Sequence, residues 1–175
     1  MAEILKAEKV SMLVHPFCYA ELWNPGGYVV GWRKDIEKPM RTMNALWKRL
    51  VEKASRDKTH VFVIAPAYHW EIVNEEGALQ KVARCETEDM SRRFEAGLII
   101  YAKKKLGRRL VLSKHNDPLV LEKALNAKNI VVSGAMFKVF GTYADLCVRV
   151  ALQNIGRHEP FKFKEAKISY ERSVW

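Results

Sequence analysis

Short apolar runs alternate with longer amphipathic segments along this chain, and this alternation constrains the fold more than any other feature. The runs Val10–Val14, His60–Pro66 and Arg109–Ser113 have the length and composition of buried strands. Apolar side chains recur at helical spacing over Ile36–Ala54 and over Glu88–Leu106, between these runs. Strands joined by helical crossovers favour a three-layer α/β fold, with a mostly parallel sheet, helices on both faces and Rossmann-type topology.

The second half of the chain continues the pattern. Asp117-Pro118 predicts a helix start, because Asp is a good N-cap and Pro is tolerated at the first helical position. A fourth strand is expected within Ile130–Phe140 and a helix over Tyr143–Ile155. Apolar and basic residues alternate over Phe161–Lys164, which predicts an edge strand running toward Tyr170. Trp70–Arg84 carries no recognisable signal and is expected to be a loop.

Length and composition favour one domain. The 175 residues are 49 % apolar, which is enough for a sizeable core, and no repeat or linker divides residues 1–175. No apolar run approaches the roughly 18 to 20 residues that cross a bilayer. Met1–Lys9 mixes charged and apolar residues and lacks the apolar centre of a signal peptide. We therefore expect a single-domain cytoplasmic protein with no membrane partner.

The cysteines and the net charge bound the chemistry. Cys18, Cys85 and Cys147 match neither a disulfide framework nor a Cys-x-x-Cys metal pair, so a thiol stays free, and we expect no metal or cofactor. The formal charge of +10, with a basic cluster at Lys103–Arg109, raises the question of a polyanionic partner. A solvated basic surface is the favoured interpretation. Nucleic-acid binding is a less favoured alternative, because the sequence has no zinc finger, aromatic RNA-binding motif or long basic tail.

Reactive residues follow the ends of the predicted strands. His15 follows the first strand, Tyr68-His69 the second, Lys114-His115 the third, and Gly141–Cys147 the fourth. Ligands of open parallel sheets bind beyond the carboxyl ends of the strands, so these residues are expected to converge. Each also has a purely structural interpretation, as an exposed strand-end lysine or a hydrogen-bonded neutral imidazole.

Cys147 has the most favourable local setting for chemistry. Thr142 and Asp145 have the spacing of a capping box, which would begin a helix just before the cysteine. The helix dipole then favours the thiolate, which is the nucleophilic form. Cys147 also lies beside the apolar stripe of that helix, so a small core residue is an equally open interpretation.

Taken in order, these motifs resemble the isochorismatase/nicotinamidase-like family of cysteine hydrolases. Gly141–Val148 is similar to the family's nucleophile motif, in which a glycine stands six residues before a cysteine that is followed by valine. Lys114 resembles the catalytic lysine, Asn24–Gly27 the early Pro-Gly-Gly turn, and Tyr68-His69 the aromatic–histidine pair. The matches span roughly residues 10–155.

The resemblance implies an isochorismatase-like fold and a mechanism. In that family the cysteine attacks a carbonyl, an aspartate after the first strand takes its proton, and the lysine stabilises the charged states. Carried over, Cys147 is the nucleophile, Lys114 is its electrostatic partner, and the backbone N–H groups of Tyr143 and Cys147 form the oxyanion hole. Trp23 and His69 are expected to contact a small-molecule substrate.

Two positions depart from the family pattern. His15 stands where the family has its aspartate, and Ala67 stands where nicotinamidases have an aspartate near their metal, so no metal site is expected. The hypothesis is that His15 acts as the neutral base for Cys147, as in other Cys–His pairs.

Two functions therefore stay open. The first is a cysteine-dependent hydrolase of a small amide or related carbonyl compound, acting on non-peptide C–N bonds. The second is a catalytically degenerate family member that binds or assembles, with nucleic acid on its basic surface as one form. Because members of the family commonly oligomerise, a homo-oligomer is expected.

Overall fold

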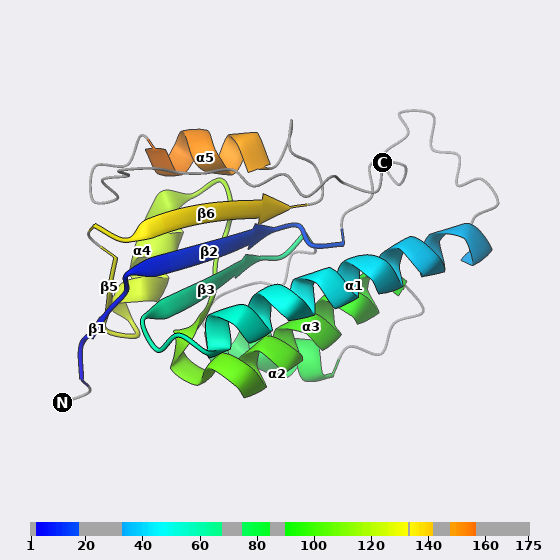
Figure 1. Cartoon of the computed structure of the whole chain (residues 1–175), viewed down its shortest axis with the longest axis horizontal. Coiled ribbons are helices and arrows are strands. Elements are labelled where there is room, and N and C mark those ends of the chain that lie inside the picture. Colours follow the sequence, from blue (N-terminus) through cyan, green and yellow to red (C-terminus); the bar gives the residue numbers. More distant parts are fainter. Residues whose placement is uncertain are drawn as a thin grey trace.

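The structure of the chain is a computed structural model, and it describes residues 3–17, 33–67, 75–84, 90–132, 134–141 and 148–156. A central parallel sheet separates two layers of helices (Figure 1). This is the three-layer α/β architecture, with helices on both faces, that the sequence predicts.

Four parallel strands form the main sheet in the order β4-β3-β2-β6. Their bounds are β2 (Lys9–Val14), β3 (His60–Ala65), β4 (Leu110–Leu112) and β6 (Met136–Gly141). β2 pairs along its whole length with β3 on one side and with β6 on the other. The chain thus builds the sheet outward from β2 in one direction and then in the other. The topological switch point lies between β2 and β6, and such points are where open α/β sheets bind ligands.

The run Ile130–Phe140 contains two strands where the sequence predicts one. β5 (Ile130–Val131) pairs in parallel with β1 (Leu5–Lys6), a short strand that the sequence pattern did not indicate. Gly134 then adopts a left-handed φ of 77° before β6 begins. Glycine takes this conformation without steric cost, so the chain leaves β5 and enters the main sheet within a few residues.

Helices cover both faces of the sheet (Figure 1). One face carries α1 (Arg33–Ser55), α2 (Glu75–Ala83) and α3 (Met90–Leu106), whereas the other carries α4 (Pro118–Asn126) and α5 (Arg149–Gly156). The sequence predicts a loop over Trp70–Arg84, and this prediction is wrong for Glu75–Ala83, which forms α2. A nine-residue helix is marginal alone, and α2 is held by packing on α3 through Leu79 and the buried Val82.

Two hydrophobic clusters fill the space between the layers. The first joins the sheet to α1, α2 and α3, and its members include Leu13, Ile64 and Leu112. The second joins the opposite sheet face to α4 and α5, and its members include Val14 and Val63. Because helices cover both faces, successive strand residues are buried alternately in the two clusters. The near-continuous apolar runs of the sequence follow from this arrangement.

Two local features test the sequence predictions. Asp117 caps α4 as expected, since its Oδ1 accepts hydrogen bonds from the N–H groups of Leu119 at 3.1 Å and Val120 at 3.3 Å. Arg109, expected within the solvated basic cluster, instead points inward. Its guanidinium donates hydrogen bonds to four main-chain carbonyl oxygens around the end of α1, among them those of Ala54 and Ser55. The Ala54 and Ser55 carbonyls belong to the last turn of α1, where no later helical residue donates to them, so the guanidinium acts as a C-terminal cap.

Some expectations lie outside the described residues, namely the edge strand over Phe161–Tyr170 and the beginning of the helix that starts near Tyr143. Among the helices that the structure describes, none combines the length and the apolar character of a bilayer-crossing segment.

Candidate active site at the carboxyl edge of the sheet

The four parallel strands of the main sheet end at one edge, and among the described residues chemically reactive side chains follow two of them. His15 follows β2, and Ser113, Lys114 and His115 follow β4. His15 and Lys114 therefore lie at the same edge of the sheet, since both follow the carboxyl ends of parallel strands.

His15 leaves the sheet in a conformation that few residues with a side chain adopt. Its φ is 47°, in the left-handed region, where histidine is more frequent than most residues. Its backbone N–H still donates to the carbonyl of Ala65 at 2.8 Å, which continues the β2–β3 ladder. The sharp turn therefore begins at His15 itself. A backbone outlier at a strand end marks a candidate functional position.

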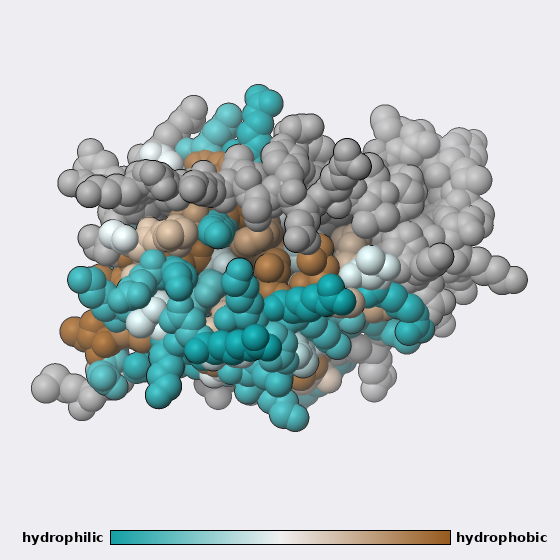
Figure 2. Space-filling view, in the orientation of Figure 1, coloured by the Kyte–Doolittle hydropathy of each residue, from teal (hydrophilic) through white to brown (hydrophobic). Residues whose placement is uncertain are grey.

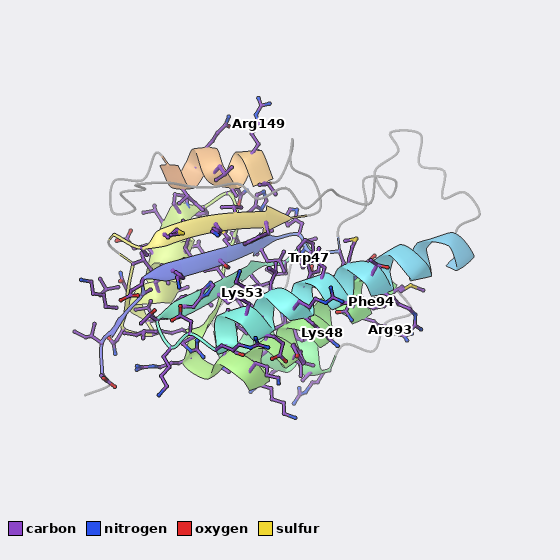
Figure 3. All side chains as sticks on the ribbon, viewed as in Figure 1. Trp47, Lys48, Lys53, Arg93, Phe94 and Arg149 are labelled. Atoms are coloured by element: carbon purple, nitrogen blue, oxygen red, sulfur yellow. The ribbon has the colours of Figure 1, made fainter. Side chains whose placement is uncertain are left out.

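The turn after His15 is anchored from the helix layer. The Trp47 Nε1–H on α1 donates to the carbonyl oxygen of Pro16 at 2.8 Å in a buried position (Figure 3). Phe17 is fully buried, and its ring centroid lies 5.5 Å from that of Phe94 on α3. The backbone that carries His15 is thus held by one buried hydrogen bond and one aromatic contact.

The His15 ring contacts the His115 ring. Their centroids are 4.3 Å apart and the ring planes meet at 74°, an edge-to-face arrangement. β2 and β4 lie on opposite sides of β3, so about 10 Å of sheet separates them. The two imidazoles therefore reach toward each other across the carboxyl end of β3. The backbone N–H of Ser113 supports this geometry, because it donates to the Ile64 carbonyl at 3.0 Å beyond the end of β4.

Burial favours the neutral form of the His115 imidazole. It lowers the pKa of His115, because a half-buried imidazolium loses solvation. His115 is therefore neutral at pH 7, and the edge-to-face contact brings no like-charge repulsion. Lys114, next to it, is exposed at the same edge and supplies a cation. In the sequence His115 is distinguished only by its place at a strand end, yet it is the residue whose ring contacts His15.

Glu95 is a buried acid that is not among the site residues expected from the sequence. Glu95 is 0 % exposed, and its side-chain Oε2 accepts a hydrogen bond from the backbone N–H of Ala67 at 2.9 Å. The carboxylate thus holds the chain just after β3, immediately before the Tyr68-His69 pair. A sequence signal existed: Glu95 stands three and seven residues before Leu98 and Ala102, on the buried stripe of α3. An acid on an apolar stripe has to be hydrogen-bonded, and therefore has a structural or functional partner.

Gly141 is closely packed at the switch point between β2 and β6. It ends β6 and pairs with Val14, the last residue of β2. A Cβ at Gly141 would lie 2.6 Å from Val148 Cγ2 and 2.7 Å from the Val14 carbonyl oxygen. Glycine is therefore required here by close approach. Val148, which directly follows Cys147 in the sequence, is buried against the junction between β2 and β6.

The remaining expected site residues, Cys147, Tyr143, Trp23 and His69, lie outside the described residues. Within the described ranges, no group of three or more His, Cys, Asp or Glu side chains has the arrangement needed to hold a metal ion.

The fold and edge geometry define a doubly wound parallel α/β protein with an imidazole pair at the carboxyl edge of its sheet. The chain matches no family model, no curated protein and no solved structure.

Proposed function

We propose that this protein is a cysteine-dependent hydrolase of a small amide or related carbonyl compound, with an isochorismatase-like fold. Cys147 is the nucleophile, His15 is the base that receives its proton, and Lys114 stabilises negative charge. The oxyanion forms against the backbone N–H groups of Tyr143 and Cys147.

One observation carries this proposal: the packing of Val148 and Val14 on Gly141 at the switch point. Val148 is the neighbour of Cys147 in the sequence, and Val14 is the neighbour of His15. Consecutive Cα atoms are about 3.8 Å apart, so the nucleophile and base that the proposal needs are each one residue from the same contact. This supports a thiol–imidazole pair formed by residues more than a hundred positions apart.

The proposed reaction needs no acid at the position of His15. The neutral imidazole takes the thiol proton, and the thiolate adds to the substrate carbonyl carbon. The resulting imidazolium returns the proton to the leaving amine as the C–N bond breaks, and water then hydrolyses the thioester. Burial lowers the pKa of His115, so this ring contacts the base in its neutral form and adds no charge beside the imidazolium.

The test is the pH dependence of iodoacetamide labelling at Cys147, followed by mass spectrometry with Cys18 and Cys85 as internal controls. We expect fast labelling of Cys147 to persist well below the ordinary thiol pKa of about 8.5. His15→Ala is expected to move that profile upward by about one pH unit, which is a tenfold slower reaction at pH 7.

His60→Ala is the matched control for His15→Ala. His60 begins β3 at the opposite edge of the sheet, and its Nε2 lies 2.9 Å from Ser11 Oγ. Removing that imidazole is expected to leave the labelling profile of Cys147 unchanged. The proposal is abandoned if Cys147 labels no faster than Cys18 and Cys85.

A second candidate, a non-catalytic binding member of the same fold, is favoured by one observation. Histidine occupies the strand-end position that the resemblance assigns to an acid, and its ring contacts His115, the residue that follows Lys114 in the sequence. His15→Asp separates the candidates. An increase in hydrolysis of small amides indicates a site that retains catalytic geometry, whereas no hydrolysis by either form favours binding.

A further inference from the structure

The helix layer formed by α1 and α3 carries a concentration of positive charge. The described side chains of α1 from Met40 onward and those of α3 include nine Lys or Arg and two acids. Helices α4 and α5, on the opposite face, together carry two basic residues and one acid. Hydrophilic side chains gather over α1 and α3 in Figure 2. Among the described side chains of these four helices, positive charge is therefore concentrated on α1 and α3.

Exposed cations on these helices form what we call the basic face, which consists of Arg49, Lys53, Arg56, Arg93 and Lys104. The first three are spaced by four and three residues, at and just beyond the end of α1, so they share one side of that helix. They extend over about 10 Å at 1.5 Å per residue. Among the described residues, none of the five forms an ion pair within 4 Å. Lys53 and Arg93 lie on the helix layer in Figure 3, whereas Arg149 lies on α5 across the sheet.

Among the side chains that the structure describes on α1 and α3, one surface acid is present, Glu52, and it is already paired. Glu52 on α1 accepts a hydrogen bond from the Tyr101 hydroxyl and pairs with Lys105 Nζ at 3.0 Å. Lys48 Nζ and Lys105 Nζ lie 5.0 and 5.6 Å from the centre of the Tyr101 ring. The hydrogen bond from Tyr101 is the largest cause that lowers the pKa of Glu52, and the hydrogen bond from Lys105 and the charges of Lys105 and Arg56 lower that pKa further. Glu95, the other acid among the described side chains of these two helices, is buried, so neither of the two described carboxylates is an unpaired surface charge.

We propose that the basic face of α1 and α3 binds the phosphate backbone of nucleic acid. A row of exposed cations along rigid helices fits a regular row of phosphates, and it reads charge rather than base sequence. Insertion into an anionic membrane is less compatible, because the apolar sides of both helices are buried against the sheet. The inference is independent of the proposed hydrolase activity.

The expected salt dependence follows from the number of cations. Five phosphate contacts on duplex DNA predict that affinity falls about 500-fold between about 50 and 200 mM salt. Removing two of the five reduces that fall to about 40-fold. The probe is a fluorescein-labelled, mixed-sequence DNA duplex titrated by fluorescence anisotropy, with a single-stranded RNA of equal length as a second arm.

The test variant is Lys53→Glu/Lys104→Glu, and the matched control is Lys123→Glu/Arg149→Glu on the opposite face. Both change the net charge by the same amount at exposed positions. The test variant is expected to bind at least tenfold more weakly at low salt, and the control within twofold of the unaltered protein. Thermal melting followed by circular dichroism checks that each is folded, and Lys53→Gln/Lys104→Gln replaces the test variant if it is not.

Three results overturn the proposal. They are absence of binding to both nucleic acids at about 50 mM salt, equal weakening by the test and control variants, and binding to phosphatidylserine vesicles but not to either nucleic acid. Equal weakening would mean that net charge alone attracts the polyanion. Vesicle binding alone would assign the basic face to a membrane surface.

Discussion

Gly141 offers the sharpest test of the packing at the switch point between β2 and β6. Gly141→Ala adds one methyl group where Val148 Cγ2 and the Val14 carbonyl oxygen would lie 2.6 and 2.7 Å from it. Non-bonded carbon contacts are favourable at about 3.5–4.0 Å, so the methyl group is about 1 Å too close on two sides. Val14 belongs to the central strand and is paired on both sides, so its backbone cannot retreat without disturbing the sheet.

The expected cost can be worked from these contacts. Adding a methylene-sized group to a packed core costs about 1–3 kcal/mol, and more where the backbone has to move. We expect Gly141→Ala to lower the free energy of unfolding by about 3 kcal/mol. For a chain of this length, that corresponds to a melting temperature lower by about 6–12 °C.

Gly97→Ala is the matched control. Gly97 is exposed within α3, and a Cβ there meets nothing within 4 Å. The same substitution should stabilise the helix by about 0.5–1 kcal/mol, because alanine loses less backbone entropy than glycine. Differential scanning calorimetry of both variants gives the comparison. If the free energy of unfolding of Gly141→Ala is within about 0.5 kcal/mol of that of the unaltered protein, the close packing at the switch point is refuted.

Two further predictions concern acids outside the proposed chemistry. Glu95→Ala leaves the Ala67 N–H without its acceptor and opens a cavity, so it should lower the free energy of unfolding, measured by urea denaturation, by about 2–4 kcal/mol. Glu95→Gln keeps an acceptor oxygen and should lower it less. Equal losses of stability in the two variants would contradict the role assigned to Glu95. The pKa of Asp57 is held well below its usual range, chiefly by the hydrogen bond from Lys9. Its stabilising effect is therefore present above the ordinary carboxyl pKa of about 4 and is lost as pH falls below it. The stability advantage of the unaltered protein over Asp57→Asn should accordingly shrink between pH 7 and pH 3, and an advantage that is unchanged would be inconsistent with the Lys9 interaction.

Local patterns in the sequence were sufficient to predict most of the helices and strands. The strands at Lys9–Val14 and His60–Ala65 and the apolar stripe of α1 follow the predicted runs, since burial on both sheet faces demands continuous apolar sequence. The cap at Asp117 was also predictable, because it depends on residues two and three positions away. Helix α2 was not, because its stability comes from contacts with α3.

The candidate site was only partly predictable. Strand ends indicated that His15 and Lys114 lie at one edge, because parallel strands share their carboxyl ends. Nothing local indicated that the His15 ring meets His115 rather than another strand-end side chain. That contact requires the strand order β4-β3-β2 and the left-handed turn at His15.

The sequence by itself determined the fold class, the direction of the strands and the edge at which reactive residues gather, because these follow from periodicity and from the geometry of crossovers. Only the tertiary structure decided which side chains meet. It turned Arg109 inward to cap α1, buried Glu95 beneath Ala67 and concentrated positive charge over α1 and α3. The physical reason is distance along the chain: such contacts join residues dozens of positions apart, and no local pattern encodes which strand or helix becomes a neighbour.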